Sequence, residues 1–385
     1  MNIHRRQFLT GALGLLATGS AGLGAARQNT PDQRNFMQRS WRLDPRCVLP
    51  RGPEGSIDSR IAGDPCIVWD EHLGKWRMFY FSSGQGAGTG LALSAGSEKI
   101  GSGDWEKIGA PKLENRDALL DQKVWHKWWV VMDIHQPNRA ARIDGQYWAL
   151  VVSVKRVQGG SSQKNIQVAH AASLAGPWTV VKQPILSPTE NYLDGRHCDT
   201  PAAYWMPDKQ RVAIFYKGYP LLSQEQQPGA AFGSGTILAD WHPREAAARK
   251  VKIILRPGVN DTWLKGWIST PQLFFDARTR NWYGLINGSP TPPADVSHRE
   301  PSPSLGGWIV CDGENLEGPW RIDTTHSPFR TPEQLTRPEL DAGLGENFWR
   351  HHLLVTPDGQ ARIYFNSGQY GHEQMYSLVA EPLAK

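Results

Sequence analysis

Four carboxylates stand just ahead of apolar, β-branched or aromatic runs in this chain of 385 residues. They are Asp64, Asp133, Asp199 and Glu346. A carboxylic acid that donates a proton and a carboxylate that accepts one are the working pair of general acid–base hydrolysis. Neighbouring carboxylates also raise each other's pKa, which keeps one of them protonated near neutral pH. Long stretches of chain separate these residues, so only the fold can bring them together.

Histidine and arginine side chains accompany these acids. The residues concerned are His135, Arg196, His197, Arg350, His351 and His352. Imidazoles and guanidinium groups can hydrogen-bond hydroxyl groups, and arginine can also hold a carboxylate. Imidazoles can equally bind a transition metal, which needs three or four ligands in a fixed geometry. The sequence has no Cys-x-x-Cys pair and no zinc-finger spacing, so we assign no residue to a metal and expect hydrogen bonding.

The runs behind these residues repeat as β-hairpins. Each copy has an apolar strand, a polar turn, and a second strand rich in β-branched and aromatic residues. The turns recur about every 70 residues, which is typical of a repeat architecture. They lie at Gly74, Gly145, Lys209, Asn281 and Gly359.

A third strand follows each hairpin, and several copies add a fourth that carries a tryptophan, namely Trp105, Trp178 or Trp320. Four antiparallel strands arranged radially make one blade of a β-propeller. We therefore predict an all-β fold, a single five-bladed β-propeller domain over residues 27–385. A pair of β-sandwiches would not explain the regular turn spacing. The short patch 244–250 is the one predicted helix.

The fifth copy has no tryptophan-bearing fourth strand after it. Residues 41–49 precede the first blade and are free to supply that strand. Pairing the two ends of the chain would close the ring and remove an open sheet edge. We therefore expect residues 41–49 to be the outermost strand of blade five.

The first 26 residues resemble an export signal. Arg5 and Arg6 form a twin-arginine pattern, followed by an apolar run over 11–23 and small residues at 24–26. This run is too short and too rich in Gly and Ala for a permanent membrane span. We predict a twin-arginine signal peptide over residues 1–26 and a periplasmic or secreted protein. The alternative is an amphipathic N-terminal helix of the fold.

Composition narrows the classes of protein that remain. The chain has 42 Lys+Arg against 37 Asp+Glu, a pI near 9.0, and 39% hydrophobic residues, enough to build a core. It has no block of like charges, which argues against a disordered polyelectrolyte and against nucleic-acid binding through a basic tract. The four cysteines, Cys47, Cys66, Cys198 and Cys311, allow one disulfide or buried free thiols. Nothing in the sequence indicates an oligomeric state.

The chain resembles a known group from about Trp41 to its end. The Asp64-Pro65 opening of blade one and the Gly-Pro-Trp strands at 176–178 and 318–320 look like the five-bladed propeller glycoside hydrolases, above all family 43 and its relatives. The resemblance implies an enzyme that cleaves O-glycosidic bonds of a polysaccharide or oligosaccharide, and residues 1–26 predict its export. It implies an arabinofuranosidase, xylosidase or arabinanase type of activity. The Trp-Met-Asn-Asp-Pro motif of the invertase branch is missing, which argues against fructan hydrolysis.

The same resemblance assigns roles to the acids. Asp64 matches the general base, and Asp133 matches the acid that orients it and modulates pKa values. At the third position the family has Glu-Gly-Pro, whereas this chain has Asp199-Thr200-Pro201. Because a shorter acid moves the proton donor by about 1.5 Å, linkage specificity would change. Either Asp199 is the general acid in a divergent subgroup, or Glu346 supplies the proton.

Tryptophans are the expected sugar platforms, because the C–H faces of sugars stack on aromatic rings. We expect Trp125, Trp128 and Trp129, in an insertion over 112–130, to overhang the mouth of the funnel, with Trp349 in a similar place. The Ser/Pro-rich stretch 289–304 is a candidate rim loop.

The resemblance implies no catalytic cofactor, but it allows a structural calcium in the channel, as in some family members. Two other functions stay open at this point. One is a non-catalytic glycan-binding propeller, and the other is a polysaccharide lyase with a histidine base.

Overall fold

The computed structural model describes residues 35–95, 105–157, 162–221, 233–258, 263–276, 279–290, 304–328, 347–356, 359–369 and 371–381. All of them belong to one compact unit. The predicted signal peptide, Glu346 and most of the stretch 289–304 lie outside the described residues. No helix in the described ranges is long and apolar enough to cross a membrane.

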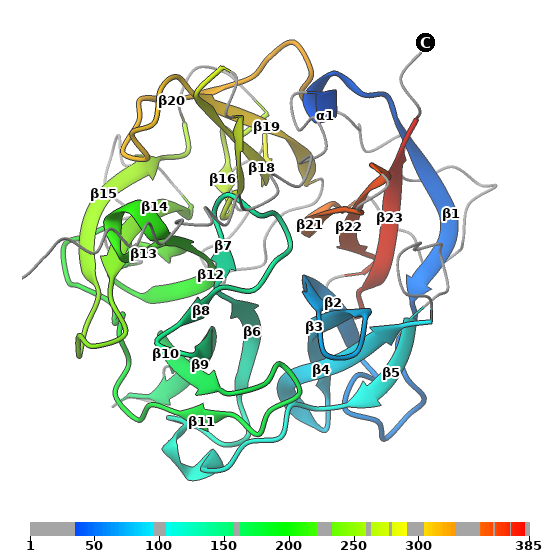
Figure 1. Ribbon diagram of the computed structural model, residues 1–385, viewed down its shortest axis with the longest axis vertical. Helices are drawn as coiled ribbons and strands as arrows, with labels where there is room; N and C mark the ends of the chain where they lie inside the picture. Colours follow the sequence, from blue (N-terminus) through cyan, green and yellow to red (C-terminus); the bar gives the residue numbers. More distant parts are fainter. Residues whose placement is uncertain are drawn as a thin grey trace, which may run out of the picture. The chain divides into compact units, whose positions relative to one another are not determined.

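Five antiparallel sheets stand around a common axis, which confirms the predicted all-β, five-bladed fold (Figure 1). Blade one contains β2 (Ile61–Asp70), β3 (Lys75–Gly84), β4 (Gly86–Ser94) and β5 (Trp105–Gly109). Blade two contains β6 (Trp125–Val130), β8 (Arg142–Ile143), β9 (Gln146–Arg156), β10 (Ser162–Ala171) and β11 (Thr179–Val180). Blade three contains β12 (His197–Met206), β13 (Arg211–Tyr219), β14 (Gly235–Trp241) and β15 (Arg249–Leu255).

Blade four contains β16 (Trp267–Ile268), β17 (Gln272–Asp276), β18 (Asn281–Ser289), β19 (Leu305–Cys311) and β20 (Trp320–Ile322). Blade five contains β21 (Trp349–Val355), β22 (Ala361–Ser367), β23 (Gln374–Ala380) and β1 (Trp41–Leu49). The strand β7 (Met132–Asp133) leaves blade two and pairs in parallel with β12 of blade three. The short helices are α1 (Asn35–Gln38), η1 (Arg116–Ala118) and η2 (Pro207–Lys209).

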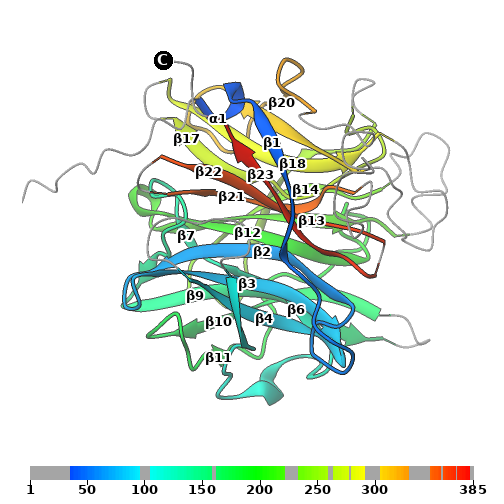
Figure 2. The ribbon, with the colours of Figure 1, turned by 90° about the vertical axis from the view of Figure 1, so that its right-hand side faces the viewer.

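The predicted closing strand is confirmed. β1 pairs antiparallel with β23, with Trp41 opposite Ala380, and both views show the two strands side by side (Figures 1 and 2). A guanidinium nitrogen of Arg362 on β22 lies 3.1 Å from the Asp44 carboxylate on β1, which adds a side-chain link within this blade. The first and last described strands of the chain therefore complete one sheet.

Aromatic side chains fill the space between neighbouring blades. Edge-to-face ring contacts link blades one and two, two and three, three and four, and five and one: Phe79–Trp178, Trp148–Trp241, Phe215–Trp320 and Trp105–Tyr364. Such pairs contribute about 0.5–1.5 kcal/mol each beyond the area they bury. The tryptophans of the fourth strands are therefore packing residues between blades, and they explain part of the count of 17 tryptophans.

Three predictions about local structure need correction or resolution. The inner strand of blade two is β6, not the stretch around Asp133, because the chain crosses the end of the channel between β6 and β8. Residues 244–250 form a turn that leads into β15 rather than a helix. The four cysteines are free thiols, and three of them are buried.

Candidate functional site

A cavity of about 480 Å³ lies at the end of the channel where the inner strands begin. Its walls come from all five blades, so residues far apart in the sequence meet there. Among the described residues, five cationic side chains and two carboxylates line it, together with aromatic and small polar side chains. The charged residues are Arg60, Lys127, Lys164, Lys217, Arg350, Asp64 and Glu373. We call this cavity the near pocket.

Three inner strands carry the same backbone irregularity at this pocket. Asp64 on β2, Lys127 on β6 and Thr200 on β12 have φ angles of +47°, +55° and +47°. Each lies where the pairing register with the next strand shifts. A non-glycine residue in the left-handed region costs on the order of 1 kcal/mol or more, and such strain is concentrated at functional sites. The distortion turns one side chain of each blade toward the pocket.

Asp64 is held by side chains of the two neighbouring blades, five and two. Its backbone N–H donates to the Asn366 side-chain oxygen at 3.1 Å, and its carboxylate lies 3.6 Å from the Lys127 ammonium. A Cβ at Gly63 would come within 2.8 Å of the Asn366 side chain, so glycine is needed for this approach. The Asp64 side chain is only 8% exposed and lines the pocket.

Asp199 is fully buried and lies behind two lysines. Its carboxylate is 2.6 Å from the Lys164 ammonium and 3.3 Å from the Lys127 ammonium, and it accepts the Thr200 backbone N–H at 2.7 Å. Burial alone would raise the pKa of Asp199, but the charges of Lys127 and Lys164 hold that pKa well below its usual range. A carboxylate that stays ionised in this way is unsuited to donate a proton. The geometry therefore makes Asp199 an anchor for the two lysines.

Aromatic rings support two further cations of the near pocket, Lys217 and Arg350. The Lys217 ammonium, on a side chain 3% exposed, lies 4.4 Å from the Trp267 ring centre and 4.8 Å from the Tyr219 ring centre. The Arg350 guanidinium lies over the Trp129 ring at 4.8 Å and donates to the Pro201 carbonyl at 2.7 Å. Cations attract the faces of aromatic rings, and more strongly where water is excluded.

Two matching clusters fix the segments that lead into β2 and β12. In blade one, Asp58 accepts from the Tyr80 hydroxyl at 2.9 Å and pairs with Lys107 at 2.6 Å. In blade three, Asp194 accepts from the Tyr216 hydroxyl at 2.7 Å and pairs with Lys250 at 2.5 Å. Each aspartate lies three positions before its inner strand begins. These clusters position the starts of β2 and β12, the strands that carry Asp64 and Asp199.

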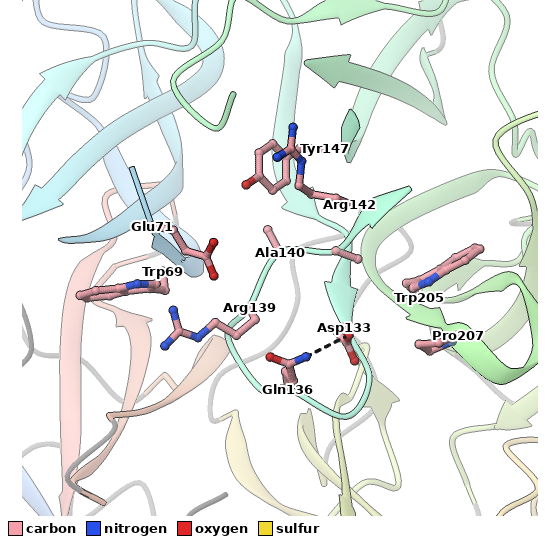
Figure 3. A pocket seen from close by; sticks show the side chains of 11 residues that line it. Trp69, Glu71, Asp133, Gln136, Arg139, Ala140, Arg142, Tyr147, Trp205 and Pro207 are labelled. Atoms are coloured by element: carbon pink, nitrogen blue, oxygen red, sulfur yellow. Dashed lines mark hydrogen bonds between the residues drawn. The ribbon is translucent and has the colours of Figure 1, made fainter. Parts of the chain in front are cut away.

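A second, smaller cavity of about 270 Å³ lies at the opposite end of the inner strands (Figure 3). We call it the far pocket. The carboxylate of Asp133 accepts the backbone N–H of His135 at 2.8 Å, and the Gln136 amide lies 3.5 Å from it. The Arg139 guanidinium lies over the Trp69 ring at 5.2 Å, and Figure 3 shows the two side chains facing each other. Asp133 thus caps its own turn, away from Asp64.

Asn138 and His352 close the channel between the two pockets. The Asn138 amide nitrogen lies 2.8 Å from His352 Nε2 and donates to the Leu353 carbonyl at 3.1 Å, while its oxygen accepts the Val355 N–H at 3.2 Å. Burial, with the charge of Arg350, lowers the pKa of His352 to about 3, so its imidazole is neutral at ordinary pH. Asn138 itself has no exposed surface.

This closure does not fit the calcium that the resemblance allows in the channel. Calcium takes about six to eight oxygen ligands. Here the Asn138 oxygen and the nearby Leu353 carbonyl already accept hydrogen bonds, and His352 offers nitrogen only. Within the described ranges, no group of three His, Cys, Asp or Glu side chains could hold a metal ion.

The structure brings together only part of the predicted site. Of the predicted residues, Asp64, His197, Trp349 and Arg350 line the near pocket, and Asp199 lies directly behind it. Arg196 packs on the Tyr219 ring beside it, at 5.5 Å. Asp133 lines the far pocket, and the exposed His135 is 3.8 Å from Asp208. His351 is buried against Phe348, and His352 lies within the channel.

The expectation that Trp125, Trp128 and Trp129 overhang the mouth is wrong. They are 4%, 2% and 2% exposed and belong to β6, where they pack in the core. Trp128 lies against Trp178 at 5.2 Å, and the Trp129 indole donates to the Ala203 carbonyl at 3.3 Å. The position of a tryptophan before a predicted strand does not show whether its ring is buried. Burial decides whether the ring can stack on a sugar or packs in the core.

Sequence reasoning missed several residues of the near pocket, namely Lys127, Lys164, Lys217, Asn366 and Glu373. A signal was present for Lys217, which shares one face of β13 with Ala213, Phe215 and Tyr219, so it is a cation within the apolar part of that face. Glu373 precedes a third strand, whereas the predicted acids all precede inner strands. Its backbone carbonyl accepts the Ala62 N–H at 3.0 Å, which places it beside the strand that carries Asp64.

Comparison with known proteins finds similarity only to solved structures. No protein-family model matches the sequence, and no curated protein does. The structure of BT0996 in an RGII complex has a TM-score of 0.66 at 12% identity, over 91% of this protein and 95% of that one. The catalytic domain of the Coprinopsis cinerea GH62 alpha-L-arabinofuranosidase has a TM-score of 0.56 at 12% identity, over 89% of this protein and 97% of that one.

The chain shares its fold with five-bladed propeller glycoside hydrolases. A thermostable family-43 glycoside hydrolase has a TM-score of 0.54 at 14% identity, over 87% of this protein and 93% of that one. At these identities the likeness establishes the fold, and the residues of the near pocket carry the argument about activity.

Proposed function

We propose that the chain is a glycoside hydrolase that cleaves O-glycosidic bonds of an oligosaccharide or polysaccharide in the near pocket. The observation that carries this proposal is the left-handed Asp64, whose carboxylate lines the pocket and is held by Lys127. The shared fold with glycoside hydrolases supports the reaction class. Export by the twin-arginine route remains a prediction from residues 1–26.

Glycosidic cleavage needs two carboxyl groups on opposite sides of the scissile bond. Asp64, beside the Lys127 ammonium, is placed as the base or nucleophile. Asp199 is ion-paired with two lysines and does not serve as the acid. Glu373 is the other carboxyl group among the described residues that line the pocket, and we assign it the proton donation to the leaving oxygen.

The remaining groups orient the sugar and keep water out. Trp349 and Trp267 present ring surface in the pocket wall, and Asn287 and Ser269 add polar groups for hydroxyl contacts. Because Asn138 and His352 close the channel below, the substrate enters and leaves through one mouth. A pocket of this kind suits a terminal sugar or a short branch.

A polysaccharide lyase is the second candidate. His197 lines the near pocket with its ring 5.6 Å from the Tyr219 ring, beside Lys164 and Lys217. A His or Tyr base next to cations is the arrangement that β-elimination from a uronate sugar requires. The products separate the two reactions, because a lyase leaves unsaturated sugars and consumes no water.

The experiment is a screen of arabinan, xylan, galactan and uronate glycans with the purified protein and three variants. Asp64→Asn should lower the rate about 10²–10⁴-fold, the usual worth of a general base. Glu373→Gln should lose activity on natural glycans but retain it on aryl glycosides whose leaving group needs no proton. Asp208→Asn, at an exposed turn carboxylate, is the control and should leave the rates unchanged. Full activity of Asp64→Asn would refute the assignment.

A further inference from the structure

Two consecutive residues of β6, His126 and Lys127, both line the near pocket. In a regular strand, successive side chains point to opposite faces of the sheet. Here the left-handed φ of +55° at Lys127, where the pairing with β9 shifts, turns both side chains toward the same cavity. Lys127 is engaged by the carboxylates of Asp64 and Asp199, whereas His126 makes no ion pair among the described residues.

The His126 imidazole is nearly enclosed but keeps unused hydrogen-bonding capacity. His126 is 5% exposed, and the Phe81 ring of blade one packs beside the imidazole with the ring centres 4.8 Å apart. Its Nδ1 is buried and has no hydrogen-bond partner in the ranges that the structure describes. Buried polar groups in folded proteins are nearly always paired, so an unpaired one in a pocket wall calls for an explanation.

The charge state of His126 follows from its surroundings. Burial and the charge of Lys164 hold the pKa of His126 well below its usual range; the Asp199 carboxylate opposes this shift and Lys127 adds to it. The ring is therefore neutral at ordinary pH, with one N–H group and one lone pair. Because no partner fixes Nδ1, the protein does not dictate which nitrogen carries the proton. The other nitrogen, Nε2, can therefore either donate or accept a hydrogen bond.

A hydroxyl group is the natural partner of such a nitrogen. A hydroxyl both donates and accepts, so it can bond to Nε2 in either tautomer, whereas an ionised carboxylate only accepts. Phe81 also lines the pocket and presents apolar ring surface next to the imidazole. A sugar offers both complements, because its hydroxyl groups lie at the edge of a ring whose C–H faces are apolar.

We propose that His126 is a specificity residue of the near pocket, whose Nε2 hydrogen-bonds a hydroxyl group of the bound sugar beside the Phe81 ring. Nε2 is the nitrogen concerned because Nδ1 has almost no exposed surface. The inference rests on the proposed glycosidase function, because it names how the same pocket selects its sugar. A site built to bond a hydroxyl rejects a ligand that lacks it, since the polar group of the site is then left unpaired.

The test separates hydrogen bonding from packing by two substitutions. His126→Gln keeps an amide at about the position of Nε2 but loses the ring, whereas His126→Phe keeps a ring that cannot hydrogen-bond through nitrogen. Cleavage of arabinan, xylan, galactan and uronate glycans is measured at steady state, and binding of oligosaccharides from the same four sources by calorimetry. His126→Phe should lower kcat/KM on the cleaved glycan and the affinity for its oligosaccharides about tenfold or more, and His126→Gln should stay within about threefold of the native chain.

The matched controls are His170→Phe and His170→Gln. His170 lies on β10 of the same blade with its ring 5.0 Å from the Trp148 ring, and it is not among the described residues that line either pocket. Both controls should leave affinity and kcat/KM unchanged. Thermal unfolding of all four variants shows whether the fold is kept. Should His126→Phe fold poorly, His126→Leu, which cannot hydrogen-bond through its side chain either, takes its place.

The binding and activity assays fail independently. Native-like binding and cleavage by His126→Phe would overturn the inference and leave the glycosidase function standing. A loss in His126→Gln as large as that in His126→Phe would also overturn it, because the ring rather than the hydrogen bond would then matter. Weaker binding by His126→Phe alone, without cleavage of any glycan, would overturn the glycosidase function and leave the sugar contact standing. Neither binding nor cleavage by the native chain would overturn both.

Discussion

The two ends of the propeller channel hold the same kinds of side chain but fix them very differently. At the near pocket, Asp64 is 8% exposed, strained at φ +47°, and held by Asn366 and Lys127. At the far pocket, Asp133 is half-buried and caps its own turn. Both ends offer carboxylates, arginines and tryptophans. The comparison teaches that packing and strain, rather than residue type, mark the end where chemistry is expected.

Buried ion pairs also hold the near end together, whereas hydrogen bonds between uncharged groups hold the far end. Asp199 with its two lysines forms a network under the floor of the near pocket. Asn138 ties the backbone of blade five to the loop between β7 and β8, whose residues Gln136 and Arg139 line the far pocket. Substituting one residue at each end tests this contrast.

The largest effect on stability is expected at Asp199. Asp199→Asn leaves the Lys127 and Lys164 ammonium groups without their buried anion, which should cost about 3 kcal/mol of unfolding free energy at neutral pH. Urea unfolding at pH 7 measures this loss. The same substitution at Asp133 is the matched control.

The pH dependence of that loss follows from the lowered pKa of Asp199. Its stabilisation is fully present above the pKa of an unfolded aspartate, about 3.9, and is lost as the pH falls from there through the folded pKa. The difference between the native chain and Asp199→Asn should therefore be largest at neutral pH and shrink below about pH 4. A difference that does not change with pH would contradict the ion-paired carboxylate.

A smaller loss of stability is expected at the far end of the channel. Asn138 has φ +61°, so Asn138→Gly keeps the backbone conformation but removes the bonds to Leu353 and Val355. We expect a loss of about 2 kcal/mol from the unsatisfied groups, with little change in kcat of the folded protein. Asn191→Gly, at φ +64° with an exposed side chain, is the control for the backbone effect. An equal loss in both variants would show that the Asn138 side chain contributes nothing.

The smallest effect is expected at Asp133 itself. Asp133→Asn retains an oxygen that can accept the His135 N–H, so stability should change by less than about 0.5 kcal/mol and kcat/KM by less than about twofold. Steady-state rates beside those of Asp64→Asn measure the contrast. A loss comparable to that of Asp64→Asn would mean that the far pocket takes part in catalysis and would erase the distinction between the two ends.

The fold could be predicted because its signals are local. Each hairpin shows a polar turn at regular spacing and apolar runs of strand length. The fifth repeat lacked a fourth strand, which indicated the closing strand β1. The predicted inner strand of blade two was wrong because the true one, β6, is separated from β9 by a segment that crosses the channel and pairs with blade three. Such a detour is decided by tertiary contacts, which a local pattern does not contain.

The site could be predicted only in part for a related reason. Asp64 belongs to a recognisable Asp-Pro pair at the start of blade one, so its position in the site could be predicted from the sequence. Lys127, Lys164 and Lys217 lie on strands, and a lysine in a strand looks like a surface residue unless the burial of its neighbours is known. The roles of Asp199 and its lysines depend on distances between separate blades, and those exist only in the folded ring.

The pairing of β1 with β23 has a consequence for the order of events during synthesis. Trp41 is synthesised long before its partner Ala380 on β23, so blade five and the ring cannot close until β23 has been made. Domains generally fold as units as the chain grows, and unpaired strand edges are prone to aggregation until they are paired. The strand β1 therefore finds its partner only when β23 appears, which couples closure of the ring to synthesis of that strand.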